Sequence, residues 1–586
     1  MNNLEIAKLL RAITAAYIIK NENRFKVMAY ERAADSIEHS TSEIKDLWED
    51  GKLGEIPGIG PSIAAHLDEL FKTGKVKHFE KIMKGLPPAM FPLLSVPGFG
   101  PKKAYKLVKI LKLVNPSTVI EDLERAAKEG KIAQLASFGE KSQEDILEAL
   151  QTFKEGQVKE KRMVLPIASA IAQEVISYLK KCPASVKVDP LGSLRRKVAT
   201  IGDIDVAVAT EKPEQVVEWF VAYPKRQKVI ESGQSGATLL LENGRQVDLR
   251  VQKPKAYGAM LQYFTGSKHH NIHLRELALK KGLSLSEYGI KRGKKLKEYS
   301  IEEEFYTILG LDWIPPELRE DAGEIEAALA HRLPKLIELK DVKGDLHVHS
   351  DYPLEPSHDL GVDSMEVIIK KAEKLGYEYI GFAEHSPSIT NHTKQQIYEI
   401  LARRKEKIEK LKLTSKIVRV INLLEVDILA DGNLSIEDKS LNLLDGAIAS
   451  VHSSFNQPKE KMTKRILSAL ANHHIRILGH PTGRMLGKRE AYEADWDKIF
   501  TFCKAHNKAL EINAWPDRLD LPDSLVHQAV KMGVKMVIST DSHAAEQMDL
   551  MTYGIAVARR GWAGKGDILN TLSYNKFITW LKGGEK

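Results

Sequence analysis

Residues 192–205 read GSLRRKVATIGDID, and this stretch decides the fold of the first half of the chain. Asp203 and Asp205 stand two positions apart in a segment that alternates as a strand does, so their side chains face the same way. Two such acids repel each other unless a cation lies between them, and Mg²⁺ prefers carboxylate oxygens as ligands. A third acid, Asp248, lies in a later predicted strand that could pair alongside. An isolated Asp-x-Asp is most often a solvated strand edge, so the surroundings decide its role.

The surroundings of these acids resemble the nucleotidyltransferase palm of family X DNA polymerases. Gly-Ser-x-Arg-Arg at 192–196 is followed by Gly-Asp-x-Asp at 202–205. The resemblance implies that Asp203, Asp205 and Asp248 are catalytic and hold Mg²⁺ or Mn²⁺, with one ion activating a 3′-hydroxyl and the other steadying pyrophosphate. Gln246 stands where the family often has Arg. This difference puts the rate of catalysis in question, but not the type of reaction.

The segment Tyr263-Phe264-Thr265-Gly266-Ser267 resembles the nucleotide pocket of the same family. In the family, the Tyr-Phe pair packs against the sugar of the incoming nucleotide and disfavours a 2′-hydroxyl. Asn271 and Arg275 follow at the spacing that contacts the minor-groove side of the base pair, and Ser193 and Arg196 are expected to hold the triphosphate. The nucleotide-binding residues that the resemblance implies are Gly192, Ser193, Arg196, Gly202, Tyr263, Phe264, Gly266, Asn271 and Arg275.

The first 155 residues show helical spacing of apolar residues almost throughout, and two short turns within them are near-copies. Ile-Pro-Gly-Ile-Gly at 56–60 and Val-Pro-Gly-Phe-Gly at 96–100 each precede a predicted helix, and 136–139 is a weaker third copy. Their glycines let the backbone present its amides at a helix N-terminus, where an anion is favoured. The turns resemble the helix-hairpin-helix motif, which grips DNA phosphates without reading sequence; a plain helix–helix turn is the alternative. The predicted DNA-binding glycines are Gly58, Gly60, Gly98 and Gly100.

The N-terminal domain also resembles the lyase domain of family X polymerases, in which a lysine forms a Schiff base with the sugar. That lysine position holds His66 here, and a neighbouring phosphate-binding lysine is replaced by Ser62. Lys26 and Tyr30 match positions that contact phosphate in the family. We therefore expect weak binding of a 5′-phosphate and little or no 5′-deoxyribose-phosphate lyase activity, with a plain surface role for His66 as the alternative.

From Gly344 onward, short apolar strands alternate with helices, which predicts a parallel barrel. Asp345-Leu346-His347-Val348-His349 puts two histidines on one face of a strand, a common metal-binding pair. Further imidazole and carboxylate side chains follow the carboxyl ends of later strands, which is where the catalytic residues of barrel enzymes lie. The predicted strands are 346–349, 379–384, 422–428, 447–452, 475–480, 509–513 and 535–540.

This second half resembles the PHP domain, the polymerase and histidinol phosphatase fold, which is a distorted (β/α)7 barrel. The resemblance implies up to three ions, and mixed nitrogen and oxygen ligands suit Mn²⁺, Zn²⁺ or Fe. An aspartate that the family has shortly after His-x-His falls in a longer segment here, where we favour Asp359 over Glu355. His358 and His392 are taken as surface residues, with extra ligands as the alternative. The implied ligands are His347, His349, Asp359, His385, Glu425, His452, His480, Asp541 and His543.

The chain has 586 residues, 43% of them hydrophobic, which suffices for several domains. We expect a multidomain α+β and α/β protein with helical DNA-binding domains, a palm, a thumb and the barrel. The predicted parts are a lyase-like DNA-end-binding domain at 1–85, a fingers-like domain at 86–155, a palm at 156–255, a thumb at 256–318, a linker at 319–340 and the PHP domain at 341–580.

The net charge of +8 fits a polyanionic partner. Two distant cysteines argue against disulfides and thiolate metal sites, and no signal peptide or membrane-spanning run is recognised, so we expect a cytoplasmic protein. The predicted function is short-gap filling in DNA repair by a monomer that takes gapped or nicked duplex DNA and dNTPs and hydrolyses DNA 3′ ends in the PHP domain. Whether hydrolysis is exonuclease, abasic-site endonuclease or phosphatase activity stays open. The rivals are a nuclease or phosphatase with a decayed polymerase half and an inactive DNA-end binder.

Overall fold

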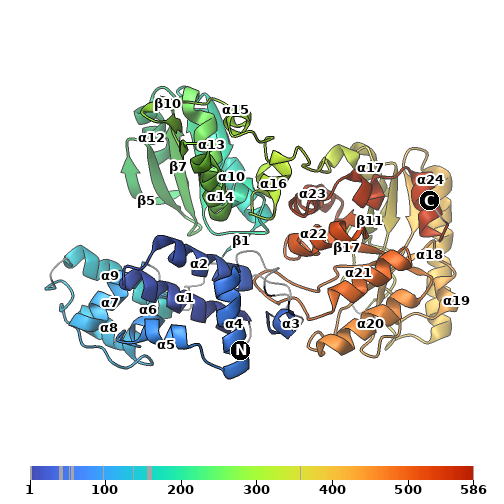
Figure 1. Cartoon of the computed structure of the whole chain (residues 1–586). Helices are drawn as coiled ribbons and strands as arrows, with labels where there is room; N and C mark the ends of the chain where they lie inside the picture. The colour runs from blue at the N-terminus through green and yellow to red at the C-terminus, as the bar shows by residue number, and fades with distance from the viewer. Residues whose placement is uncertain are drawn as a thin grey trace. The chain divides into compact units, whose positions relative to one another are not determined.

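The computed structural model describes residues 3–38, 44–49, 51, 53, 59–96, 98–135, 138–154, 162–356 and 358–584 (Figure 1). The chain divides into two compact units, residues 1–161 and residues 162–586. Within the described residues, no helix combines the length and apolar character needed to cross a membrane.

In the described residues of the unit 1–161, every regular element is a helix, as the apolar spacing predicts. Two separate apolar cores hold it together, one built from residues 6–82 and the other from residues 89–150. Its helices are α1 (Asn3–Ile19), α2 (Arg24–Glu38), α3 (Ile44–Glu49), α4 (Pro61–Thr73), α5 (Lys77–Met83), α6 (Met90–Leu93), α7 (Pro101–Ile110), α8 (Val119–Lys128) and α9 (Glu140–Lys154).

The two Pro-Gly turns lead directly into α4 and α7. Gly60 and Gly100 are the N-caps, with extended backbone, and each is followed by a proline in the first helical position, where no amide hydrogen is needed. Gly98 has a φ of +74°, a conformation that favours glycine. The predicted DNA-binding Gly58 of the first turn lies outside the described residues, as does Pro97 of the second turn.

The unit 162–586 begins with a five-stranded sheet ordered β2-β4-β7-β6-β5. β4 (Ile204–Ala209) and β7 (Gln246–Gln252) run parallel, and their register puts Asp205 directly beside Asp248. Val206 and Val208 of β4 belong to the core shared with α10 (Leu165–Leu179) and α12 (Pro213–Val221), whereas Ala207 and Ala209 pack with Tyr257. Asp205 therefore faces the side of the sheet that carries α13 (Tyr257–Thr265). The remaining elements are β1 (Met163–Val164), β2 (Lys187–Pro190), α11 (Gly192–Arg195), β3 (Thr200–Ile201), β5 (Arg226–Gly233) and β6 (Gly236–Leu241).

The thumb region that follows has one core of its own, and the segment expected to be a linker contributes to it. Residues 319–340 contain α16 (Glu324–Leu329), whose Ile325 and Ala328 are buried in this core. Arg319 and Glu324 of the same segment are completely buried. The other elements are α14 (Lys268–Lys280), β8 (Leu283–Ser286), β9 (Gly289–Arg292), β10 (Lys295–Lys297), α15 (Glu302–Ile308) and the short 3₁₀ turn at Pro316–Leu318.

The C-terminal part is a closed parallel barrel, which confirms the predicted distorted barrel fold. The third predicted strand, 422–428, is in fact split, because β13 ends at Asn422 and β14 begins at Glu425. Parallel bridges join His385 to Glu425 and Val348 to Ser542, and so close the ring between the two sheets. The strands are β11 (Gly344–Val348), β12 (Tyr379–Phe382), β13 (Arg419–Asn422), β14 (Glu425–Asp427), β15 (Ala447–Ser450), β16 (Ile475–Leu478), β17 (Ala509–Asn513) and β18 (Lys535–Ser539).

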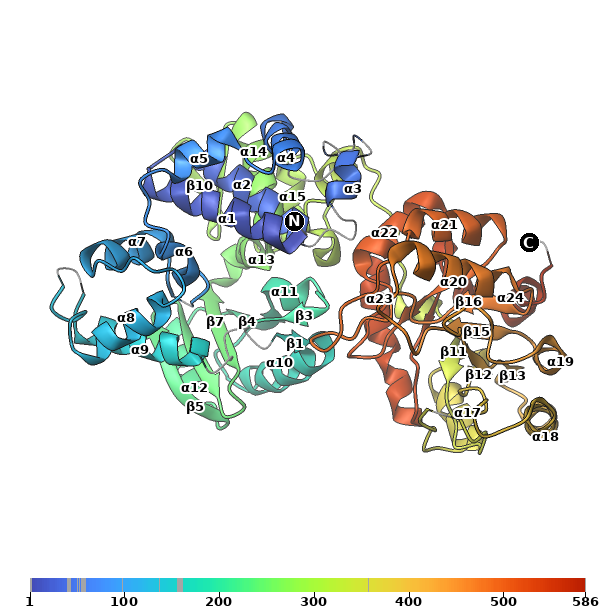
Figure 2. The ribbon, with the colours of Figure 1, turned by 90° about the horizontal axis from the view of Figure 1, so that it is seen from below.

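Helices surround these strands, and one of them closes an end of the barrel. In Figure 2, α18, α19, α20, α21 and α24 lie around the strands. Phe577, Trp580 and Leu581 of α24 share a core with residues of the barrel strands such as Leu346 and Ala509. The opposite end, at the carboxyl ends of the strands, carries the predicted metal ligands. The helices are α17 (Met365–Lys374), α18 (Lys394–Thr414), α19 (Asp438–Leu441), α20 (Lys459–Ala471), α21 (Trp496–Ala505), α22 (Asp523–Met532), α23 (Met551–Arg560) and α24 (Tyr574–Leu581).

Candidate functional site

The structure brings the three predicted palm acids together. A ligand oxygen of each of Asp203, Asp205 and Asp248 lies within 4.8 Å of the others. Asp248 is held in place, because Gln246 Nε2 donates to its Oδ2 at 2.8 Å and the Thr238 hydroxyl donates to its Oδ1. Gln246 therefore orients a predicted metal ligand, which gives a reason for the amide at a position where the family often has Arg.

The electrostatics of this cluster fit a cation site. Burial and, after it, the neighbouring Asp203 and Asp248 together raise the pKa of Asp205 to about 7, against the opposing effect of Arg250 and Arg196. A divalent cation between the carboxylates would remove this repulsion. The three acids are thus unfavourable together without a cation and suit one with hard oxygen ligands.

The loop before β4 is packed against these acids. Gly192 has a φ of +56°, and a side-chain Cβ there would lie 2.5 Å from Asp205 Oδ2. The position therefore needs glycine, and Ser193 follows it in the first turn of α11. Gly202 directly precedes Asp203 at the start of the same acidic segment.

The two arginines of the Gly-Ser-x-Arg-Arg motif are held by acids of the thumb. Arg195 forms a two-point ion pair with Glu302, at 2.6 and 2.9 Å. Arg196 Nε donates to Glu320 Oε1 at 2.9 Å, and its Nη1 donates to the carbonyl oxygen of Thr265.

Glu320 also connects the palm to the barrel. Arg560 of α23 donates to Glu320 Oε1 at 2.9 Å and to the Arg196 carbonyl oxygen at 2.8 Å. Its Nε reaches Asp523 Oδ2 at 2.6 Å. These contacts form one series of side chains with alternating charge, which we call the palm–barrel ion chain. Its members, in order, are Asp523, Arg560, Glu320 and Arg196.

The predicted nucleotide pocket is assembled from α13 and α14. Asn271 Nδ2 donates to the Tyr263 carbonyl oxygen at 2.7 Å, and the Arg275 guanidinium lies 5.3 Å from the Tyr263 ring centre. Tyr263 and Phe264 contact each other edge to face, 5.0 Å apart. Gly266 has a φ of +67°, and a Cβ there would lie 3.1 Å from Arg196 Nη1. The pocket residues and the triphosphate residues thus share one side of the sheet.

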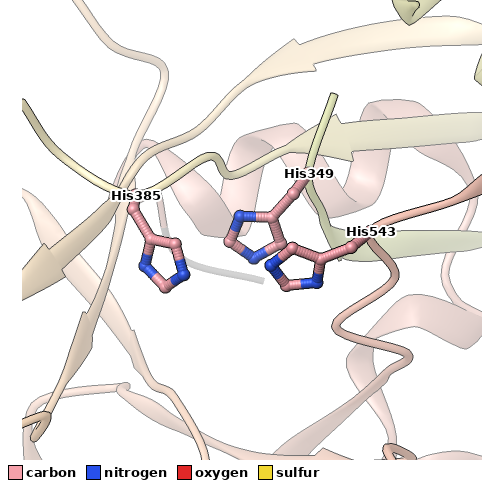
Figure 3. Close-up of side chains that lie close together, drawn as sticks. All are labelled: His349, His385 and His543. Atoms are coloured by element: carbon pink, nitrogen blue, oxygen red, sulfur yellow. The ribbon is translucent and has the colours of Figure 1, made fainter. Parts of the chain in front are cut away.

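The barrel ligands converge at the carboxyl ends of the strands. Four overlapping groups have ligand atoms within 4.8 Å of one another. Figure 3 shows one of them, in which the imidazole rings of His349, His385 and His543 approach from three different segments. The groups are His349, His385 and His543; His358, His385 and His452; His347, His349 and Asp541; and Glu425, His452 and His480.

Several polar atoms in this cluster are buried without a hydrogen-bond partner among the described residues. They include His349 Nδ1 and His480 Nδ1. Unpaired buried polar atoms are costly. Burial also lowers the pKa of His349 to about 3 and of His480 to about 4, so both imidazoles are neutral, as ligation requires. The cluster therefore fits a centre for metal ions with nitrogen and oxygen ligands.

The longer segment after His-x-His separates the two candidate carboxylates. Asp359 Oδ1 lies 3.6 Å from His385 Nε2, and its Oδ2 lies 3.5 Å from His543 Nε2. Glu355 is instead paired with His392, at 3.3 Å. Of the two carboxylates, Asp359 thus lies beside two of the predicted ligands, and its role as a ligand stays a prediction.

His358 lies nearer to the cluster than a surface residue would. Its ring centre is 4.7 Å from that of His385 and 4.6 Å from that of His452, and 29% of its side chain is exposed. Of the two alternatives for His358, the extra-ligand one agrees with this position. His392 is in none of the four groups.

Supporting acids of the barrel were not recognised from the sequence. Glu511 Oε1 lies 2.8 Å from His347 Nδ1, and Asp427 Oδ1 lies 2.5 Å from His452 Nδ1. Carboxylates that pair with the second ring nitrogen commonly orient metal-binding histidines. Asn513 Nδ2 contacts Glu511 Oε2 and Asp541 Oδ2, both at 3.1 Å. Glu511 and Asn513 stand two apart on one strand, so alternation was the signal that could have found them.

The predicted phosphate contacts of the first unit are only partly brought together. The Tyr30 hydroxyl lies 2.6 Å from His66 Nδ1, and His66 stacks on His78 with ring centres 4.8 Å apart. Lys26 instead pairs with Glu22 at 3.2 Å. Burial and His78 lower the pKa of His66, so its imidazole is neutral and attracts a phosphate only weakly.

One of the known proteins matches almost the whole chain, and others match parts of it. Family models match at residues 1–76 (helix-hairpin-helix domain), 90–152 (SAM-like helix-hairpin-helix tandem), 260–320 (DNA polymerase beta thumb) and 345–514 (PHP domain). A Bacillus subtilis protein called DNA polymerase/3′-5′ exonuclease PolX is 36% identical over 99% of this chain and 100% of its own length. Rat DNA polymerase lambda is 24% identical over 48% of each chain. A probable phosphatase of Thermoanaerobacter is 27% identical over 37% of this chain and 89% of its own.

Proposed function

The chain belongs to the PolX family of DNA polymerases, and we propose that it fills short gaps in DNA and hydrolyses DNA 3′ ends at two separate centres. The observation that carries this proposal is the presence of two separate clusters of side chains that could hold metal ions, one in the palm and one in the barrel. An inactive end binder would have no need of either set.

In the palm, Asp203, Asp205 and Asp248 would hold Mg²⁺ or Mn²⁺. When bound, such ions supply neutralising charge to the triphosphate and activate the primer hydroxyl. Arg196 and Ser193 would hold the triphosphate, since Arg196 lies close enough to Asp205 to lower its pKa. Tyr263 would lie against the sugar, with its carbonyl oxygen fixed by Asn271.

In the barrel, up to three ions of Mn²⁺, Zn²⁺ or Fe would be held by the predicted ligands. These are His347, His349, Asp359, His385, Glu425, His452, His480, Asp541 and His543. When bound, such ions supply a nucleophile near neutral pH and charge that binds the phosphodiester. Glu511 would fix the ring of His347 and Asp427 that of His452. Because His349 and His480 are neutral when buried, no proton needs to leave either one on ligation.

Mutation should separate the two activities. Asp203→Ala and Asp205→Ala are expected to abolish nucleotide addition and to leave 3′-end hydrolysis intact. His347→Ala with His349→Ala is expected to do the reverse. The assay is a labelled gapped duplex incubated with each metal, with and without dNTPs. Loss of both activities in a folded Asp205→Ala protein would contradict the two-centre proposal.

Phosphatase activity is a second candidate for the barrel, since a probable phosphatase matches 37% of this chain. Release of inorganic phosphate from a 3′-phosphorylated oligonucleotide would indicate it, and cleavage within a duplex that contains an abasic site would indicate endonuclease activity. Mononucleotide release from a 3′-hydroxyl end is the result we expect.

The remaining parts of the proposal concern partners and boundaries. We propose gapped or nicked duplex DNA and dNTPs as ligands, a monomeric state and a cytoplasmic location. The division at 85, 155, 255, 318 and 340 is supported by the separate cores of residues 6–82 and 89–150 and by the matched ranges. The packing of α16 favours counting residues 319–330 with the thumb.

A further inference from the structure

A tight turn after β17 adjoins the barrel ligands. Strand β17 carries Glu511 and Asn513, and the chain then turns between Trp515 and Arg518. The Trp515 carbonyl oxygen accepts from the amides of Arg518 and Leu519, both at 2.9 Å. The side chains of Trp515 and Arg518 are not used in the proposal above.

This turn is fixed from both sides. The Trp515 amide donates to Asn513 Oδ1 at 2.9 Å, and the Ala514 amide donates to the Ser539 carbonyl oxygen at 2.8 Å. Arg484 Nε donates to the Arg518 carbonyl oxygen at 2.9 Å, and its Nη2 donates to that of Leu519. A turn held in this way can present its side chains in a defined position before a ligand arrives.

The side chains at both ends of the turn lie beside predicted metal ligands of the barrel. The Trp515 ring lies edge to face against His543, with centres 6.2 Å apart. Arg518 Nε lies 3.6 Å from Asp541 Oδ2, and 16% of its side chain is exposed. Figure 3 shows that the His543 ring faces the group of imidazoles, so Trp515 adjoins the rim of the cluster.

The Arg518 guanidinium differs from the other arginines nearby. Among the described residues, it has no hydrogen-bond acceptor, and Asp541 is its one ion-pair partner. Arg489, in contrast, donates to the Gly483 carbonyl oxygen at 2.9 Å and lies 3.7 Å from the Phe455 ring centre. A cation beside a metal centre weakens metal binding unless an anion comes between them. Arginine suits a phosphodiester in that place, since its planar donors match the two free oxygens.

We propose that Trp515 and Arg518 form the nucleotide-recognition element of the hydrolytic centre. Arg518 binds the free oxygens of the scissile phosphodiester, and Trp515 stacks on the base of the 3′-terminal nucleotide. Stacking on an aromatic ring accepts every base, which suits hydrolysis without sequence preference. The inference rests on the proposed 3′-end hydrolysis and adds the part of the substrate that each residue contacts.

The test uses the full-length protein and two single-stranded oligonucleotides that differ only at the 3′ end. One ends in thymidine, and the other ends in a tetrahydrofuran residue that lacks a base. Trp515→Ala should raise KM for the thymidine end about tenfold or more and leave the baseless end unchanged. Arg518→Gln should lower kcat/KM for both ends by about a hundredfold, with partial recovery in Arg518→Lys. Arg403→Gln and Phe502→Ala, on the outer helices α18 and α21, are the matched controls.

A second measurement is independent of turnover. An oligonucleotide with a 3′-terminal 4-thiothymidine is irradiated with the protein in EDTA, and the adduct is mapped by mass spectrometry. We expect cross-linking to the peptide that contains Trp515, lost in Trp515→Ala. Gap filling by each variant should equal that of the wild type, which shows that the fold is intact.

The outcomes distinguish the inference from the function on which it rests. A wild type that hydrolyses neither oligonucleotide would contradict the proposed function, while the cross-link would still decide the inference. Cross-linking elsewhere, or a Trp515→Ala protein that keeps the wild-type preference for the thymidine end, would overturn it. So would an Arg518→Gln protein with unchanged kcat/KM.

Discussion

Replacing Asp205 by Asn should make the metal-free palm more stable at pH 8, although it removes a predicted catalytic ligand. The pKa of Asp205 is raised from its ordinary 3.8 to about 7, first by burial and then by Asp203 and Asp248. The fold therefore disfavours the ionised carboxylate. The stability that this group contributes is complete below pH 3.8 and is lost as the pH rises through about 7.

The size of this effect follows from the shift. About three pKa units correspond to about 4 kcal/mol for a fully ionised group. Water reaches part of the side chain and screens this cost, so we expect about 2 kcal/mol. This corresponds to a change of about 30-fold in the opening equilibrium of the strands that carry the acids.

Hydrogen exchange in EDTA measures this change where it occurs. Peptides from β4 and β7 should be about 30-fold better protected in Asp205→Asn than in the wild type at pH 8, and the difference should shrink at pH 5. Glu211→Gln, an exposed acid just after β4, is the control for charge removal. Mg²⁺ should raise protection in the wild type and have little effect on Asp205→Asn. Equal protection of the two metal-free proteins at pH 8 would refute the argument that the fold disfavours the ionised Asp205 carboxylate.

Three further results are expected. Glu511→Gln should lower the metal affinity of the barrel by about 10- to 100-fold, because His347 loses its fixed orientation; elemental analysis after dialysis checks this, and full metal content would count against it. Asp359→Asn should reduce 3′-end hydrolysis while Glu355→Gln keeps it, and the reverse pattern in an exonuclease assay would assign the ligand to Glu355. Borohydride should trap no covalent adduct with an incised abasic duplex, because His66 cannot form the imine that a lysine forms; efficient trapping that maps to the N-terminal domain would show that another lysine acts.

The sequence was sufficient to predict the position of a site residue wherever that position follows from the alternation of side chains along a strand. Asp203 and Asp205 share a face because strand side chains alternate, and Asp248 joins them because parallel neighbours align in register. The barrel ligands were predictable for a similar reason, since the carboxyl ends of parallel strands meet at one end. The resemblance to known families added the roles of these residues, which spacing alone does not supply.

Other features depend on contacts that no local pattern encodes. Leu423 and Leu424 continue the apolar run of their strand, so the break between β13 and β14 was hidden. His358 lies in a segment that is longer than in the family, so its distance along the sequence from the predicted ligands does not indicate whether it lies near them in space. The burial of Ile325 in the thumb core was missed because α16 is too short to show a helical period.

The palm–barrel ion chain affects what a truncated form of this protein would keep. Cutting the chain after residue 340 would remove Arg560 and leave Glu320 with Arg196 as its single partner among the contacts seen here. The carboxylate would then compete more strongly with a triphosphate for that arginine. If Arg196 holds the triphosphate as we propose, a polymerase fragment prepared without the barrel should bind dNTPs less well than the intact chain, and the barrel would then act as a structural accessory of the polymerase.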